Sequence, residues 1–340
     1  MNSATPNRIL YLNTAFLGDA ILSTPVLRAL KNLYPQARLD LVAIPQTASV
    51  FSGNPYISQV YTWDKRDPWK RILGLVKLLI RLRKNRYDLA LSPHVHFSTT
   101  LIMILAGIPV RIGFPRLKGS THVVRVAKGM PVVRRNLELL RPLSGKPFDH
   151  QTEMFIPAEG QNQVDEFIKE NSLDPARLVG IAPGSVWATK RWPSRYYSQV
   201  LSGLVAKGFQ PVLIGGEDDA GLCGKIITDS QVEAVNAAGQ LSLPGSAWLI
   251  KNCRLLITND SAPLHLANAV QTPVLAIFGP TVKRFGFFPY REGDRVLEMD
   301  LDCRPCGKHG HQRCPRGHFG CMTRISPESV LNNALEMLNP

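Results

Sequence analysis

The chain has 340 residues, of which 44% are hydrophobic and 19% charged, and it carries a formal net charge of +14 at pH 7. This length is sufficient for two domains with separate cores, and no stretch of about 18 apolar residues predicts a transmembrane helix. The positive charge favours a polyanionic partner: a nucleic acid, an anionic lipid or a phosphorylated substrate. The first residues lack the basic start and apolar block of a secretory signal, so we expect a cytoplasmic protein.

The first half of the sequence alternates between apolar strands and helices. Strands are predicted at 8–12, 39–44, 60–62 and 88–92, and helices at 20–33, 69–88 and 98–106. Gly18 permits a tight turn after the first strand, which places Asp19 at the entrance of the first helix. The helix dipole favours an acid there whether the acid does chemistry or only caps the helix.

The predicted helix at 69–88 has two faces. Ile72, Leu75, Val76, Leu79 and Leu82 recur at helical spacing, and Lys and Arg residues occupy the other side. Basic amphipathic helices of this kind bind anionic membranes, but any helix that packs on a sheet needs the same apolar stripe. We therefore expect the stripe to pack on the sheet and the basic face to stay free for lipid headgroups.

Two histidines follow the predicted strand at 88–92. His94 and His96 are residues of a kind that can ligate metals or act as acid–base groups, but no carboxylate lies near them in the sequence. We interpret their loop as the edge of a polar cleft. The basic stretch at 116–135 would meet an anionic acceptor, and a linker is predicted at 143–160.

The second half repeats the alternation, which predicts a second doubly wound domain. Polar loops at 183–190, 215–219 and 259–262 each follow the carboxyl end of a predicted parallel strand. Ligands bind at that edge of an open sheet, so we expect the three loops to converge. Because neither the P-loop motif nor the glycine-rich dinucleotide-binding motif occurs, the sequence does not indicate an ATP-hydrolysing or NAD-binding site.

The stretch from 255 to 281 is a predicted strand, helix and strand with the polar turn Asn259-Asp260-Ser261. Ser261 is a good N-cap, and the free N–H groups of the following helical turn attract phosphate. The same three residues are also typical of an ordinary loop and cap. Together with Ser185 and Lys190 of the first polar loop, they would hold a diphosphate.

Several motifs are spread over nearly the whole chain. They are Gly18-Asp19 with Thr24-Pro25, Pro183-Gly184-Ser185 with Lys190-Arg191-Trp192-Pro193, and Asn259-Asp260-Ser261 with His265-Leu266-Ala267 and Phe278-Gly279-Pro280-Thr281. In this order they resemble glycosyltransferase family 9, the ADP-heptose:lipopolysaccharide heptosyltransferases. The last group is the most specific of the three.

The resemblance implies an α/β protein with the GT-B fold, in which two Rossmann-like doubly wound domains face a central cleft. An acceptor-binding domain is expected at 1–155 and a nucleotide-sugar-binding domain at 156–325. The final segment, 326–340, is expected to form a helix that packs back across the domains.

The resemblance also implies an inverting transfer of heptose from ADP-heptose to the lipopolysaccharide inner core. Asp19 would be the general base that takes the proton of the acceptor hydroxyl. Gly18, His94 and His96 would lie on the acceptor side. The acceptor would be an anionic lipid A-core glycolipid, reached by peripheral contact at the cytoplasmic face of the inner membrane.

The donor site implied by the resemblance comprises Ser185, Lys190, Glu217, Asp260, Ser261, Ala262 and His265. Lys190 and Ser185 would stabilise the departing diphosphate, so neither a catalytic metal nor another cofactor would be needed. Ala262 replaces a glycine that is usual in the family, which is acceptable if this residue is already helical. His265 lies one turn after Ser261 and could reach the phosphates or pack beneath the loop.

Four of the six cysteines form a cluster, Cys303, Cys306, Cys314 and Cys321, within the segment 303–321. The cluster contains a single C-x-x-C pair, whereas a zinc ribbon has two. A structural zinc, reduced thiols and a local disulfide in a surface loop are therefore alternatives.

Two other functions compete with glycosyl transfer. A sugar-nucleotide epimerase or hydrolase of the same fold would act on the donor without an acceptor. A basic protein that binds nucleic acid would suit the net charge, but the sequence shows no recognisable nucleic-acid-binding module, and we expect no such partner.

Overall fold

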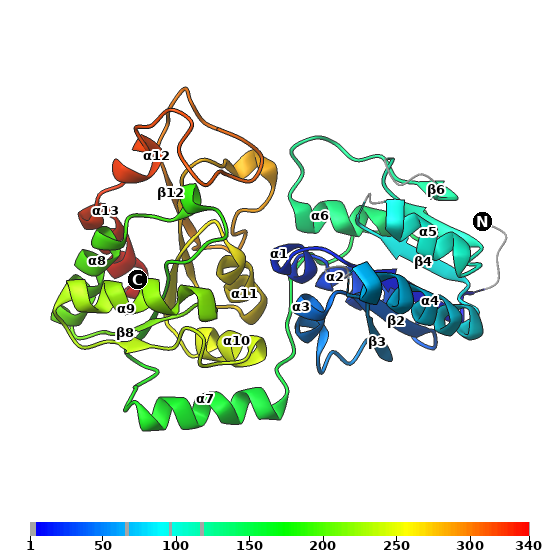
Figure 1. The fold of residues 1–340 in the computed structure, drawn as a ribbon, viewed down its shortest axis with the longest axis horizontal. Coiled ribbons are helices and arrows are strands. Elements are labelled where there is room, and N and C mark those ends of the chain that lie inside the picture. Colours follow the sequence, from blue (N-terminus) through cyan, green and yellow to red (C-terminus); the bar gives the residue numbers. More distant parts are fainter. Residues whose placement is uncertain (1–4, 65–67, 95–96, 116–118, 340) are drawn as a thin grey trace. The chain divides into compact units, whose positions relative to one another are not determined.

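The computed structural model describes residues 5–64, 68–94, 97–115 and 119–339. The chain divides into two compact units, Met1–Phe155 and Ile156–Pro340. Within the described residues, each unit contains one six-stranded sheet with helices packed on it (Figure 1). All strand pairs described are parallel, as the alternation of strands and helices predicts.

The N-terminal sheet has its first strand near the middle. In order across the sheet, the strands are β3 (Gln59–Thr62), β2 (Arg38–Ala43), β1 (Arg8–Leu12), β4 (Leu89–Ser92), β5 (Val110–Gly113) and β6 (His122–Val123). Its α-helices are α1 (Leu17–Ile21), α2 (Thr24–Leu33), α3 (Pro45–Ala48), α4 (Pro68–Asn85), α5 (Phe97–Leu105) and α6 (Val132–Leu137). The continuous apolar runs of β1 and β4 are buried, which is typical of strands covered on both faces.

Two features of this unit differ from the sequence prediction. The single helix expected at 20–33 is two helices, α1 and α2, because Pro25 lies in the first turn of α2 and cannot continue a helix from α1. The basic stretch contains the short helix α6, whose buried side includes Val132 and Val133.

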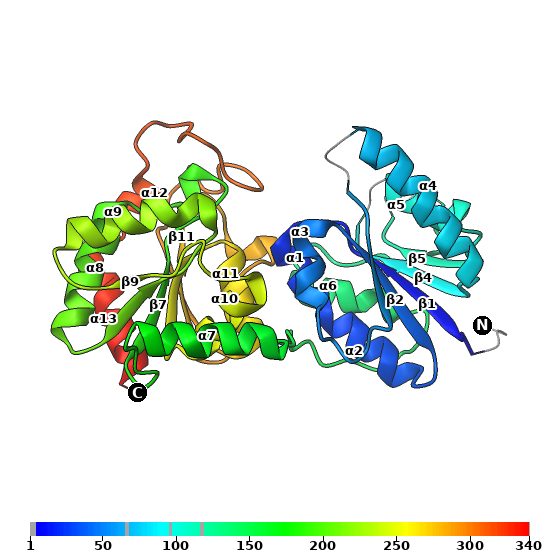
Figure 2. The ribbon, with the colours of Figure 1, turned by 60° about the horizontal axis from the view of Figure 1, so that its bottom comes forward.

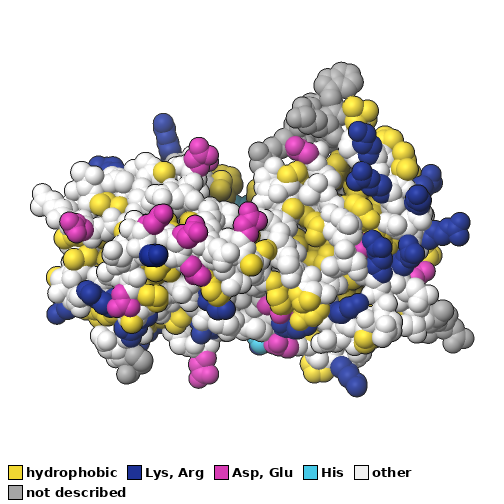
Figure 3. Space-filling model, turned by 90° about the horizontal axis from the view of Figure 1, so that it is seen from below, with side chains coloured by type: hydrophobic (Ala, Val, Ile, Leu, Met, Phe, Trp, Pro, Cys, Tyr) yellow, Lys and Arg dark blue, Asp and Glu magenta, His cyan; other side chains and the backbone are white. Residues whose placement is uncertain are grey.

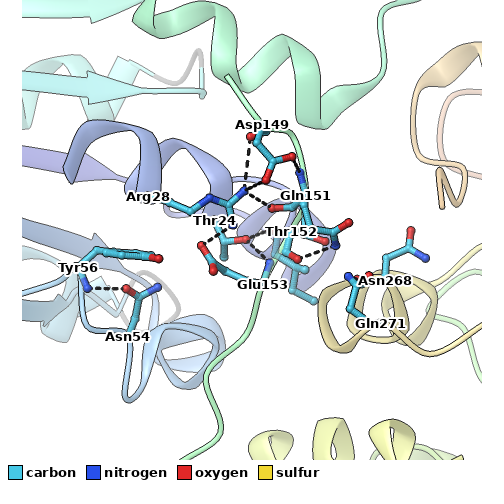
Figure 4. A network of polar contacts seen from close by, with 11 residues as sticks. Thr24, Arg28, Asn54, Tyr56, Asp149, Gln151, Thr152, Glu153, Asn268 and Gln271 are labelled. Atoms are coloured by element: carbon cyan, nitrogen blue, oxygen red, sulfur yellow. Dashed lines mark hydrogen bonds and ion pairs between the residues drawn. The ribbon is translucent and has the colours of Figure 1, made fainter. Parts of the chain in front are cut away.

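Ion pairs and hydrogen bonds hold residues 149–153, near the end of the N-terminal unit, against α2 (Figure 4). Arg28 forms ion pairs with Asp149 at 2.7 Å and with Glu153 at 3.0 Å, and it donates to the carbonyl of Gln151 at 2.8 Å. The Glu153 amide donates to the Thr24 hydroxyl at 3.1 Å. This part of the predicted linker is therefore ordered on the N-terminal unit.

The C-terminal sheet has the order β12 (Arg295–Glu298), β11 (Val274–Phe278), β10 (Leu255–Asn259), β7 (Leu178–Ala182), β8 (Gln210–Leu213) and β9 (Val235–Asn236). Its α-helices are α7 (Ala158–Glu170), α8 (Ser194–Ala206), α9 (Ala220–Ser230), α10 (Leu243–Lys251), α11 (Ala262–Val270), α12 (Gly320–Thr323) and α13 (Pro327–Leu338). Helix α7 packs on α10 (Figure 2). Strands β7, β10 and β11 are buried along their whole length, so they form the centre of the core.

The final helix, α13, belongs to the C-terminal core. Val330, Ala334 and Leu338 are buried there, and the helix packs on α8 and β10. The expectation that this helix packs back across both domains stays a prediction.

Candidate functional site

The predicted convergence of polar loops is confirmed in the C-terminal unit. Strand β7 lies between β10 and β8, so the loops that follow these three strands are neighbours. Asn259, at the end of β10, donates to the carbonyl of Pro183 at 2.8 Å. Its side-chain oxygen accepts from the Trp192 amide at 3.2 Å and from the Tyr197 hydroxyl at 3.0 Å. Asn259 thereby fixes the loop 183–190 against the turn 259–262.

The third loop, 215–219, is joined to the first by close packing. A Cβ atom on Gly184 would lie 2.3 Å from a carboxylate oxygen of Asp219, and one on Gly215 would lie 2.6 Å from the Asp219 Cβ. Asp219 also accepts from the Gly216 amide at 3.2 Å. Asp219 is not among the predicted site residues, although two glycines in adjacent loops are a signal of close backbone approach. Glu217, the donor contact predicted in this loop, is exposed.

Lys190 and Asp260 form a buried ion pair next to the turn. The Lys190 Nζ atom lies 2.6 Å from Oδ2 of Asp260, and the Thr281 hydroxyl donates to the same oxygen at 2.6 Å. The side chains of Lys190 and Asp260 are only 13% and 7% exposed. Asp260 thus positions the Lys190 ammonium. Its predicted contact with the donor stays a prediction.

Helix α11 begins at this ion pair. Ser261, its N-cap, makes no capping hydrogen bond, and its buried Oγ has no partner among the residues described. Ala262 is the first helical residue, so the replacement of the usual glycine does not require positive φ. Pro263 has no N–H and the Leu264 amide donates to the Ser261 carbonyl at 3.2 Å, so Ala262 is the residue of this first turn whose amide can face a ligand. That amide, a buried hydroxyl and an adjacent ammonium at a helix N-terminus are suited to hold a phosphate group.

His265 lies one turn along α11 and is buried, with 3% of its surface exposed. Burial lowers its pKa to about 4; Asp260 opposes this shift and Lys190 adds to it. The ring is therefore neutral at pH 7 and contributes no positive charge to the site. Its Nδ1 atom has no hydrogen-bond partner within the described chain. Its ring packs against that of Phe287, with the two ring centres 6.1 Å apart.

The pKa of His265 predicts a loss of stability in acid. Its folded-state pKa is about 4 and its ordinary value 6.5, so the unfolded chain binds a proton first as the pH falls. Relative to His265→Gln, the wild-type free energy of unfolding should fall by about 3 kcal/mol more between pH 7 and pH 4. Urea unfolding across this pH range measures the difference, and parallel curves for the two proteins would show that the histidine does not titrate as described.

The predicted acceptor-side residues meet around a buried asparagine in the N-terminal unit. Asp19 lies in the first turn of α1, and its carbonyl accepts from Asn13 Nδ2 at 3.4 Å. The other side-chain atom of Asn13, Oδ1, lies 3.0 Å from Nε2 of His94. The structure thus brings Asp19 and His94 to one asparagine. His96 lies outside the described residues.

Arg135, on α6, is a residue that the sequence analysis missed. Burial is the main cause that lowers its pKa, and the nearby charge of Asp19 acts in the opposite direction. Its Nε atom is buried without a hydrogen-bond partner in the described part of the chain, and its guanidinium lies 5.8 Å from the Phe114 ring centre. A half-buried cation therefore lies close to the predicted base. In the sequence it was one of many basic residues between 116 and 135.

The cysteine-rich segment is attached to the donor-side loops. The His311 amide donates to the Thr189 hydroxyl at 2.8 Å, and the Thr189 amide donates to the His311 carbonyl at 3.0 Å. The Cys306 amide donates to Pro280 at 3.1 Å, and Arg304 donates to the Thr281 carbonyl at 2.7 Å. Lys190 and Thr281 both contact Asp260, and the cysteine-rich segment thus supports the loops that carry these two residues. The sequence pattern did not indicate this role.

The four cysteines of this segment are free thiols in the structure. Burial raises the pKa of Cys306, and it raises that of Cys321 to about 11. Among the described residues, no group of three or more His, Cys, Asp or Glu side chains is placed to hold a metal ion. The choice among zinc, thiols and a disulfide stays a prediction.

The sequence profile of glycosyltransferase family 9 (heptosyltransferase) matches residues 75–314. The chain belongs to this family. As a glycosyltransferase it is similar to lipopolysaccharide heptosyltransferase 3 of Escherichia coli, at 31% identity over 78% of this chain and 82% of that protein. It is 28% identical to lipopolysaccharide heptosyltransferase 2 of Escherichia coli strain K12, over 96% of this chain and 98% of the relative.

The structure agrees with this membership. It superposes on a solved family 9 glycosyltransferase from Veillonella parvula with a TM-score of 0.87 and 25% identity, covering 98% of this chain and 97% of that one. The two parallel sheets with flanking helices confirm the GT-B fold class that the motifs predicted.

Proposed function

We propose that this glycosyltransferase moves a heptose from ADP-heptose to the inner core of lipopolysaccharide, with inversion at the anomeric carbon. The names of its relatives, lipopolysaccharide heptosyltransferases 2 and 3, support the donor sugar and the acceptor class. The observation that carries the proposal is the buried Lys190–Asp260–Thr281 network beside the N-terminus of α11. It offers positive charge and N–H donors to a nucleoside diphosphate.

In the proposed reaction, the bond between the anomeric carbon and the diphosphate oxygen breaks, and negative charge develops on the departing ADP. Lys190, the Ser185 hydroxyl and the backbone amides of Ser261 and Ala262 would stabilise that charge. Asp260 would act on this step through Lys190, because it holds the ammonium in place. Preorganised donors of this kind supply the stabilisation that a divalent metal provides in other transferases.

Asp19 would take the proton of the acceptor hydroxyl as this oxygen attacks the anomeric carbon from the face opposite the leaving group. The charge of Asp19 acts on Arg135, so a positive charge lies near the proposed base. His94, which shares Asn13 with the Asp19 loop, would contact the acceptor. The acceptor would be an anionic lipid A-core glycolipid, so we place the enzyme at the cytoplasmic face of the inner membrane.

A panel of nucleotide sugars tests the proposal. The purified protein is incubated with ADP-heptose, ADP-glucose and UDP-glucose, with and without a heptose-deficient core acceptor, and nucleoside diphosphate release is measured. We expect release from ADP-heptose only when the acceptor is present, and the same rate after treatment with EDTA. Release that does not need the acceptor would favour a hydrolase or epimerase, and a rate abolished by EDTA would refute the metal-independent mechanism.

A further inference from the structure

Helix α4 presents a second apolar face away from the core of the N-terminal unit. Its inner face contributes Leu78 and Leu82 to a buried cluster, with Leu75 and Leu79 packed against them. Ile72 and Val76, which the sequence analysis expected on the packed stripe, are instead 56% and 51% exposed. The reason is that the helix has more apolar residues than one sheet-facing stripe can use.

The exposed apolar residues form a continuous outer stripe. Ile72, Val76 and Ile80 recur every four residues, and Leu73 lies next to them at a spacing of three from Val76. Leu73 and Ile80 are 60% and 63% exposed. Such side chains are normally scattered singly on the surface of a soluble protein, so a stripe of four indicates a binding surface.

Positive charges border this stripe. Lys77 and Arg81 run along one side of it, Arg83 and Lys84 follow Ile80 at its C-terminal end, and all four are exposed. The sequence of α4 from Pro68 to Asn85 contains no Asp or Glu. Figure 3 shows hydrophobic and basic side chains side by side on this unit. An apolar centre with basic borders matches a surface that is apolar inside and anionic at its boundary.

Helix α5 also carries exposed apolar side chains. It contacts α4, and its last turn exposes Ile104 and Leu105 at 46% and 38%. A helix that crosses a membrane is not an alternative, because none of the described helices is long and apolar enough to do so. The surface therefore fits a partner into which side chains insert while the helix lies flat.

We propose that the outer stripe of α4, Ile72, Leu73, Val76 and Ile80, docks on an anionic lipid bilayer. The apolar side chains enter the acyl region, and Lys77, Arg81 and Lys84 contact the lipid phosphates. A second protein copy would meet the same positive charges on its own stripe, which disfavours self-association through this face. The inference rests on the proposed function only in that the acceptor is membrane-bound.

Sedimentation with vesicles tests this docking surface. The full chain is mixed with vesicles of phosphatidylethanolamine and phosphatidylglycerol, or of phosphatidylcholine alone. We expect binding to the anionic vesicles only, and a loss on the order of tenfold or more in Leu73→Glu/Ile80→Glu. Lys207→Glu in the other unit is the matched control, since Lys207 is exposed and this substitution changes the net charge by the same amount as the two glutamates, so the variant should bind like the wild type.

A second readout separates this inference from the proposed function. Leu73→Glu/Ile80→Glu should keep transfer to a delipidated, water-soluble core acceptor, which also shows that it folds, while transfer to the acceptor in vesicles falls. Equal vesicle binding by wild type and this variant would overturn the inference and leave the proposed function intact. A wild-type dimer that Leu73→Glu/Ile80→Glu disrupts would also overturn the inference and leave the proposed function intact. Anionic-vesicle binding without any transfer would instead refute the proposed function alone.

Discussion

Asp19→Asn should reduce heptose transfer on the order of 10²- to 10⁴-fold, because it removes the base that takes the acceptor proton. The substitution keeps the size of the side chain and the backbone contact with Asn13. Donor binding should therefore remain unchanged, since the groups proposed to hold the diphosphate belong to the C-terminal unit. Single-turnover transfer measures the first effect, and calorimetric titration with ADP measures the second.

Glu159→Gln is the matched control for Asp19→Asn. It makes the same kind of change at an exposed carboxylate on α7, so its transfer rate should equal that of the wild type. Near-normal transfer by Asp19→Asn would remove Asp19 from the role of base. Equal losses of transfer and ADP affinity would indicate that the substitution disturbs folding instead.

Lys190→Met should reduce transfer by about 10²- to 10³-fold, because it removes the ammonium proposed to stabilise the departing diphosphate. It should also destabilise the protein by about 3 kcal/mol, because Asp260 would remain buried without its positive partner. Affinity for ADP should fall as well, since the ammonium faces phosphate in the bound state. Denaturant unfolding and transfer kinetics report the two effects separately.

The double variant Lys190→Met/Asp260→Asn distinguishes catalysis from stability. Both charges of the pair are then absent, so most of the lost stability should return, while transfer should remain as slow as in Lys190→Met. Recovery of transfer along with stability would contradict a direct role for Lys190. Thr281 keeps its hydroxyl near position 260 in both variants, so the comparison isolates the charged pair.

The sequence predicted the elements that carry strong local signals. Strand β1 has the predicted bounds, 8–12, and the stretch 255–281 forms the predicted strand, helix and strand as β10, α11 and β11. Each of these elements is a short apolar run or a helix between clear turn residues. The order of parallel strands also made the convergence of the three polar loops predictable.

The contacts between distant residues were not predictable from local pattern. Lys190 and Asp260 are separated by 70 positions, and nothing in their neighbourhoods shows that they form an ion pair. The sequence does not distinguish Arg135 from the adjacent Arg134. In the structure both lie on α6, and Arg135 is the one near the charge of Asp19. The apolar residues of α4 fit one packed stripe or two faces equally well, and only the fold shows that Val76 points away from the core.

The most direct test of the central claim is the structure of the reaction product. The purified protein is given ADP-heptose and a heptose-deficient core acceptor, and the product is analysed by NMR. We expect a heptosylated glycolipid whose new linkage has the anomeric configuration opposite to that of the donor. Free heptose with an unmodified acceptor, or a linkage that retains the donor configuration, would contradict it.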